Sequence, residues 1–125
     1  MTPEDLAAWL VSMGYSRRRA AVELGSTKMS LGRWLAGQVP INHRVGLACA
    51  ALSAGLQPHP DLRQWQRHLC YNNVVCAHLL GVDRVSYQRW LAREDETTRV
   101  VMLAFSAIAA GLPPWQSNKV INHDL

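Results

Sequence analysis

The residues of this chain best suited to chemistry are hydrogen-bond donors spaced along residues 17–37, RRRAAVELGSTKMSLGRWLAG. Three consecutive arginines open this stretch: Arg17, Arg18 and Arg19. A second group of polar and flexible side chains follows further along: Thr27, Lys28, Met29, Ser30 and Arg33. Lys and Arg carry donors only, so they suit phosphate oxygens and the O6 and N7 acceptors of guanine, while Thr and Met offer apolar contact to a thymine methyl.

Two short helices joined by a tight turn would position these groups. Ser16 is expected to cap a helix over 17–24, and Gly25 supplies the positive φ that ends it. Ser26 or Thr27 then caps a second helix that runs to Ala36. The small and apolar residues of the stretch face a shared core: Ala21, Leu24, Leu31 and Trp34. The basic residues are left to face outward.

The same pattern occurs a second time, at one constant offset and without a gap. Gly25 pairs with Gly81, Trp9 with Trp65, and residues 33–36 (RWLA) with residues 89–92 (RWLA). The matches fall on core and turn positions, which indicates a tandem duplication of one structural unit. We therefore predict an all-α protein with a first repeat over 1–56, a second repeat over 57–112 and a tail over 113–125. Each repeat is expected to hold four helices.

The two windows, about 17–37 and 73–93, resemble the DNA-reading motif of the Cro/C1-type (XRE-like) helix-turn-helix regulators. The resemblance implies a lambda-repressor-like fold that binds double-stranded DNA and represses transcription, as is frequent in phages and mobile elements. Position 26, usually apolar in this family, is Ser26 here, whereas Val82 keeps the family pattern. Two motifs in one chain could act as a pseudo-dimer on an asymmetric site. If only the first motif reads DNA, a homodimer on an inverted repeat is expected.

In such proteins the second helix of the motif presents its N-terminal side chains to base edges, and the preceding helix meets phosphates. The resemblance therefore assigns the second-helix group named above to base contacts and the three arginines to phosphates. Arg44, at the start of the fourth helix, is expected to add a phosphate contact. The second motif keeps a plausible reading face: Arg84, Ser86, Gln88 and Arg89. Asp83 is explained as a helix N-cap.

Each of these assignments has a simpler structural alternative. The arginine run could be a solvated helix face, and all four repeated tryptophans are expected to be core residues rather than base-stacking groups. The second repeat is less cationic, because Asn73-Val74-Val75 replaces the arginines and Glu94-Asp95-Glu96 follows its second helix. The second motif has either become a scaffold or reads DNA with different contacts to the backbone. The tail is expected to lie as a strap on its own repeat, with a dimer contact as the alternative.

Composition limits the remaining classes of function. The net charge of +4 and pI near 9.3 suit a polyanionic partner. Three cysteines without framework spacing indicate reduced thiols in a cytoplasmic protein, and no apolar run is long enough to span a membrane. The pattern His68-x-Cys70 and Cys76-x-His78 fits no common zinc module, so no metal or cofactor is expected.

No catalytic set and no small-molecule site stands out, so an enzyme is not expected. The rival to DNA binding is a protein-interaction module derived from a helix-turn-helix, such as an antiactivator or an inhibitor of a nucleic-acid enzyme.

Overall fold

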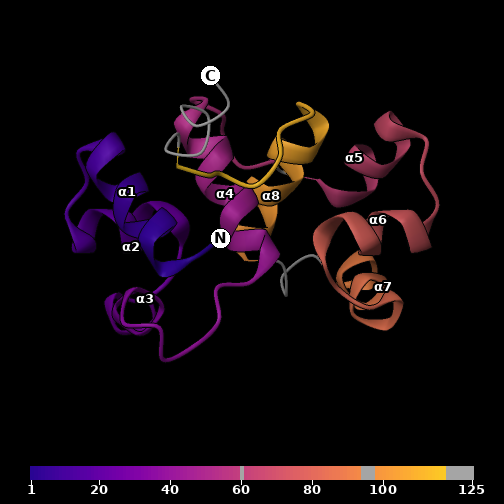
Figure 1. Ribbon diagram of the computed structural model, residues 1–125. Coiled ribbons are helices and arrows are strands. Elements are labelled where there is room, and N and C mark those ends of the chain that lie inside the picture. Colours follow the sequence, from indigo (N-terminus) through magenta and orange to yellow (C-terminus); the bar gives the residue numbers. More distant parts are fainter. Residues whose placement is uncertain (60, 94–97, 118–125) are drawn as a thin grey trace, which may run out of the picture.

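The computed structural model describes residues 1–59, 61–93 and 98–117, and over these ranges it is all-α, as predicted. It contains eight helices and no strand within those ranges (Figure 1). The helices are α1 (Pro3–Met13), α2 (Arg17–Leu24), α3 (Lys28–Leu35), α4 (His43–Ser53), α5 (Leu62–Leu69), α6 (Asn73–Leu80), α7 (Arg84–Ala92) and α8 (Arg99–Ala109). We call residues 1–56 the first half and residues 57–112 the second half.

The helix boundaries recur with the offset that relates Gly25 to Gly81 in the sequence. α6 and α8 begin and end at the counterparts of the ends of α2 and α4, and α7 begins at the counterpart of the start of α3. α5 is the exception, since it begins at Leu62 rather than at the counterpart of Pro3, His59. The backbone N–H of His59 instead donates to the carbonyl of Met102 at 3.0 Å, which holds the preceding segment against α8.

Helix ends follow the local chemistry of the sequence. Thr2 and Asp5 form a reciprocal capping box at the start of α1, and Ser16 accepts from the Arg19 amide at the start of α2. Of the two caps considered for α3, the structure uses Thr27, whose hydroxyl accepts from the Ser30 amide. Gly25 and Gly81 end α2 and α6 with φ of 72° and 71°.

One tryptophan in each half ties its first helix to its fourth. Trp9 and Trp65 are fully buried, as expected. The indole N–H of Trp9 donates to the carbonyl of Cys49 at 3.1 Å, and that of Trp65 donates to the carbonyl of Phe105 at 2.8 Å. These bonds satisfy the one polar atom of each indole inside the core. Trp34 and Trp90 are only half-buried, and they pack on the edge of the same core.

The two halves share a single core, centred on α4 and α8 (Figure 1). The consecutive residues Val45–Ala51 of α4 are all buried, because α8 covers the side of α4 that its own half leaves open. The fourth helix of the first half is therefore buried over most of its length.

Reciprocal contacts flank this central pair of helices. Arg99, at the start of α8, donates through Nε to the carbonyl of Glu23 at 2.7 Å and packs on Gly25. The counterpart of Arg99, His43, packs in the same way on Gly81. The halves are therefore related by an approximate twofold axis, the arrangement of an isologous dimer within one chain.

Within the described part of the tail, residues 113–117, the backbone hydrogen bonds run to the first half and not to the tail's own repeat, contrary to the expectation. The backbone N–H of Trp115 donates to the carbonyl of Gly46 at 3.0 Å, and the amide of Ser117 donates to the Asp5 carboxylate at 3.3 Å. Both acceptors belong to the first half. Trp115 and Gly46 are the repeat counterparts of His59 and Met102, so the tail repeats on α4 the contact that the linker makes on α8.

Candidate nucleic-acid interface

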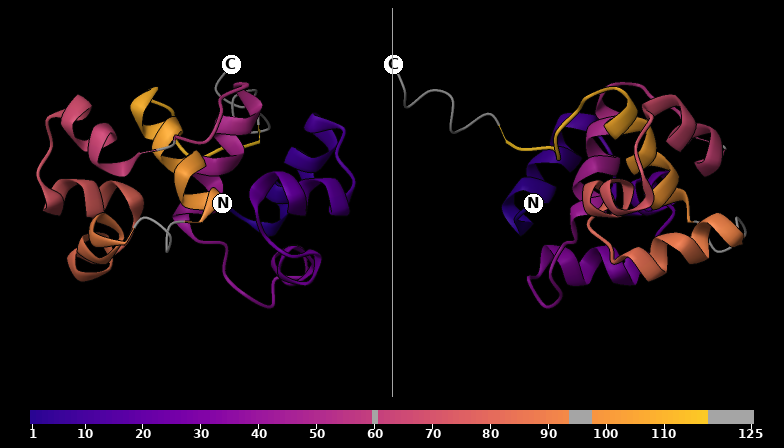
Figure 2. Two further views of the ribbon diagram at one scale, coloured as in Figure 1. Left: turned by 180° about the vertical axis from the view of Figure 1, so that it is seen from behind. Right: turned by 90° about the vertical axis from the view of Figure 1, so that its right-hand side faces the viewer.

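α3 and α7 lie on the same side of the molecule, one on each flank of the α4/α8 pair (Figure 1). The side view shows both helices along one edge (Figure 2). Each of them is the second helix of a predicted motif. The two predicted reading helices are therefore presented on the same side of the molecule. The twofold relation of the halves produces this placement.

Packing decides which side of α3 is exposed. Leu31 is fully buried and Trp34 packs on the core, so the opposite side of the helix faces solvent. The predicted base-reading residues all lie on that exposed side or beside it: Thr27, Lys28, Met29, Ser30 and Arg33. Met29 is 67% exposed. An apolar side chain this open to water is free to contact an apolar partner such as a thymine methyl group.

α7 is anchored by a tyrosine where α3 uses a leucine. Tyr87 is fully buried, and its hydroxyl donates to Gln66 Oε1 at 2.8 Å. Burial raises the pKa of this phenol, so it stays a protonated donor. The predicted reading residues on α7 are again exposed or half-buried: Arg84, Ser86, Gln88 and Arg89.

Sequence reasoning missed one residue of this face, Val85. It is 66% exposed and is the counterpart of Met29. Applying the repeat offset to the first reading group would have found it. Both halves therefore present an exposed apolar side chain, flanked by a cation, at the same point of the helix.

The three arginines at the start of α2 are all exposed, but they differ in their contacts. Arg19 Nε lies 3.5 Å from a Glu23 carboxylate oxygen, and its guanidinium stacks 5.1 Å from the Tyr15 ring centroid. Arg17 and Arg18 make no side-chain hydrogen bond or ion pair within the described parts of the chain. Of the three arginines at the start of α2, Arg17 and Arg18 are thus the two whose charge is more available to an anion.

Arg44 lies apart from this surface, at the contact between the halves. Its Nη1 donates to the carbonyls of Leu80 and Gly81, each at 3.1 Å. These are carbonyls at the C-terminal end of α6, so the guanidinium caps a helix of the other half. Partial burial lowers the pKa of Arg44. A phosphate contact by Arg44 stays a prediction, beside this structural role.

The start of α6 is apolar where the start of α2 is cationic. Val74 and Val75 stand at the positions of Arg18 and Arg19 and are 55% and 37% exposed. The acidic run 94–96, which makes the second repeat less cationic, lies outside the described residues. The second half therefore lacks the arginine run but keeps the outward-facing residues of α7.

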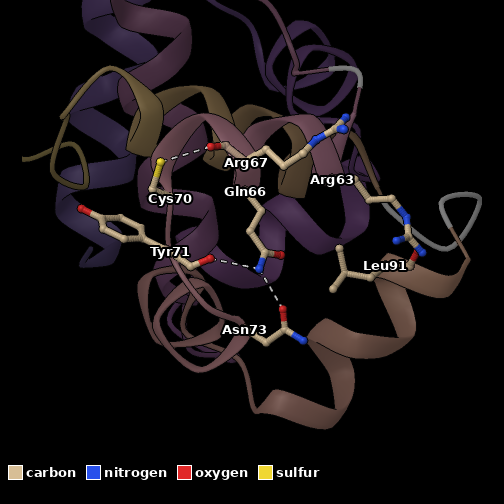
Figure 3. Close-up of a pocket in the computed structure, with 7 residues that line it drawn as sticks. All are labelled: Arg63, Gln66, Arg67, Cys70, Tyr71, Asn73 and Leu91. Carbon is tan, nitrogen blue, oxygen red and sulfur yellow. Dashed lines mark hydrogen bonds between the residues drawn. The ribbon is translucent and has the colours of Figure 1, made fainter.

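An open pocket of about 530 Å³ lies in the second half, where the end of α5 meets α6 and α7 (Figure 3). Most of the residues that line it carry polar side chains: Arg63, Gln66, Arg67, Cys70, Tyr71, Asn73 and Leu91. The volume falls in the range of ligand sites. No motif pointed to it, and the signal available in the sequence was the difference between the two repeats at several lining positions.

The described cysteines and histidines form no cluster suited to a metal ion. Cys49 and Cys76 are buried, and burial raises the pKa of both thiols, whereas Cys70 is exposed. Across the described ranges, no three His, Cys, Asp or Glu side chains come together as metal ligands would.

No helix in the part of the chain that the structure describes is long and apolar enough to cross a membrane. No protein-family model, curated protein or solved structure matches the chain.

Proposed function

We propose that this protein binds double-stranded DNA in a sequence-specific manner and regulates transcription, acting as a repressor, through two tandem lambda-repressor-like helix-turn-helix units. The observation that carries the proposal is the common orientation of α3 and α7 on one side of the molecule (Figure 2). Each exposes a short row of basic and apolar side chains there. Paired recognition helices that enter successive major grooves likewise lie on one side of a protein, which supports the proposal.

The two helices would read different bases. α3 offers Lys28 and Arg33, which suit guanine, while α7 offers Arg84 and Arg89 together with Gln88, which suits adenine. The preferred site is therefore a quasi-palindrome with unequal halves. Arg17 and Arg18 add sequence-independent phosphate contacts at the first half-site.

One chain would fill the role that two subunits fill in a dimeric repressor. The side of α4 that could pair with a second copy is already covered by α8. The contacts of Arg44 and Arg99 hold the halves in one arrangement. We expect one chain per DNA site. A complex of two chains per site would favour the homodimer that the family resemblance also allows.

Selection from a random duplex pool at two salt concentrations tests the proposal. We expect enrichment of one asymmetric motif, with half-sites centred roughly one helical turn apart. Analytical ultracentrifugation of the selected duplex with the protein then measures the stoichiometry. Failure to enrich any sequence at either salt concentration contradicts sequence-specific binding.

Substitutions separate base reading from phosphate contact. Lys28→Ala and Arg33→Ala should each cost about 1–3 kcal/mol on the selected site and relax its sequence preference. Lys28→Arg, which keeps the charge, serves as the matched control and should retain much of the affinity. Replacing Arg17, Arg18 and Arg19 with alanine should instead weaken binding to all duplexes and flatten the salt dependence.

A protein-interaction module is the second candidate, and the apolar surface of the second half favours it. Val74, Val75 and Val85 are exposed at the starts of α6 and α7. If the duplex selection fails, replacing these three valines with serine should abolish binding to the protein partner while leaving the fold intact by circular dichroism.

A further inference from the structure

The polar pocket of the second half is built around a glutamine whose bonds are all made inside the protein. Gln66 Nε2 donates to the carbonyl of Tyr71 at 3.0 Å and to Asn73 Oδ1 at 2.8 Å (Figure 3). Its Oε1 accepts from the Tyr87 hydroxyl. The bond to Oδ1 fixes the Asn73 side chain at the first residue of α6 and leaves its Nδ2 as a donor. Internal hydrogen bonds therefore hold the floor of the pocket, and Asn73 Nδ2 remains as a donor.

Two arginines one turn apart on α5 supply the charge. Arg63 Nη2 donates to the carbonyl of Leu91 at 2.8 Å, which ties α5 to the end of α7. Arg67 is exposed and has no side-chain hydrogen bond or ion pair within the ranges the structure describes. Of the described residues, those that line the pocket include no acidic side chain. A pocket with donors, two cations and no carboxylate in its lining favours an anion.

Comparison of the halves shows that their arginines lie on different helices of the repeat. Arg63, Gln66, Arg67 and Cys70 stand where the first half has Ala7, Leu10, Val11 and Gly14. The arginines of the first half lie instead at the start of α2, where the second half has Asn73, Val74 and Val75. Each half thus carries arginines beside the start of its second helix, but on different helices.

We infer that this pocket binds a phosphate group, with Arg67 as its principal ligand and with Asn73 and Arg63 beside it. The inference rests on the proposed function for the source of the phosphate, which is then the DNA backbone at the second half-site. In helix-turn-helix complexes the first helix of the motif crosses the backbone, and here that helix is α6, whose first residue lines the pocket. The pocket takes the place of the missing arginine run.

The salt dependence of duplex binding tests the pocket separately from base reading. Arg67→Ala should weaken binding to specific and random duplexes alike, about threefold to tenfold, and lower the slope of log K against log salt by about one. Arg67→Lys should restore most of the slope. Ser12→Glu changes the net charge by the same amount at an exposed position of α1 and should leave the slope near the wild-type value.

Chemical labelling gives a second readout at the pocket itself. Cys70 lines the pocket and is exposed, while Cys49 and Cys76 are buried, so the neutral reagent N-ethylmaleimide should modify Cys70 first. Bound duplex should slow this reaction at least threefold in the wild type but not in Arg67→Ala. Protection by millimolar inorganic phosphate without DNA would identify a free phosphate compound as the source.

The outcomes separate this inference from the proposed function. If the wild type binds duplex and Arg67→Ala changes neither the salt slope nor the protection of Cys70, the phosphate pocket is wrong and DNA binding stands. If the wild type binds no duplex, DNA binding is wrong, and protection of Cys70 by inorganic phosphate decides the pocket. If neither duplex nor inorganic phosphate protects Cys70, the phosphate pocket is wrong.

Discussion

Trp115 donates its backbone N–H to the carbonyl of Gly46, 3.0 Å away, although the two residues lie in different parts of the chain. His59 makes the same bond to Met102 in the other half. The two bonds show that the segment that follows α4 crosses α8, and that the segment that follows α8 crosses α4. The chain is thus interlocked in the manner of a dimer with exchanged arms.

Gly46 should be required by the crossing tail. A Cβ at this position would lie 2.9 Å from Pro114 Cβ, and the proline ring cannot rotate away. We expect Gly46→Ala to lower stability by about 1 kcal/mol or more, although alanine is the better helix former. Urea denaturation of the full chain measures the effect.

Gly32 provides the matched control for Gly46. It also lies within a helix, but a Cβ there meets nothing within 4 Å. Gly32→Ala should therefore raise stability by roughly 0.5–1 kcal/mol. A stabilising Gly46→Ala would show that the tail does not occupy this position in solution.

Three glycines with positive φ form a graded series that tests the contact between the halves. Gly14, Gly25 and Gly81 have φ of 68°, 72° and 71°, so alanine costs each of them a similar backbone strain of about 1 kcal/mol. A Cβ would meet nothing at Gly14, would lie 3.1 Å from His43 Cβ at Gly81, and 2.5 Å from Arg99 Cβ at Gly25. The loss of stability should therefore be smallest for Gly14→Ala, larger for Gly81→Ala and largest for Gly25→Ala. Equal losses at the three positions would contradict the packing of Arg99 and His43.

Cys70 should be a strained residue, because it adopts φ of 58° where the first half uses Gly14. We expect Cys70→Gly to raise stability by about 1 kcal/mol, since glycine accepts this conformation without cost. Cys70→Ala keeps the strain and should be close to neutral. Thermal melts of the two variants, compared with the wild type, separate the backbone effect from loss of the thiol.

Ser26 should weaken the first half. Its Oγ is buried, and no hydrogen bond reaches it from the described residues. Val82 fills the equivalent position and packs on the core. Ser26→Val should therefore raise stability by about 1 kcal/mol or more, because it removes an unsatisfied hydroxyl. The reverse exchange, Val82→Ser, should lower stability; a gain there would show that the site tolerates a hydroxyl.

Asp83 should make the cap of α7 sensitive to acid. Hydrogen bonding from the Ser86 backbone amide holds the pKa of Asp83 below its ordinary value of 3.8. The cap is then fully formed above the unfolded pKa, and its contribution is lost as the pH falls through the lower, folded value. Asp83→Thr copies the cap that Thr27 gives α3 and should reduce the loss of stability between pH 7 and pH 3. An identical pH dependence in both proteins would exclude Asp83 as a source.

Local chemistry in the sequence determined the helices. Capping residues such as Ser16 and Thr27, glycines at the ends of helices and the period of the apolar residues act within a few positions, so α2 and α3 were predicted nearly to the residue. The repeat offset transferred those predictions to α6 and α7. It also indicated which side of α3 is exposed, because Leu31 and Trp34 must be covered.

Only the tertiary structure decided how the halves meet. The pairing of α4 with α8, the capping of α6 by Arg44 and the path of the tail onto Gly46 join residues far apart in the chain. No local pattern encodes such contacts, because they depend on which apolar surfaces remain uncovered after each half has folded. The same holds for the pocket at Arg67, whose walls come from three helices. The sequence determined which side chains could bind an anion, and packing decided which of them stand together.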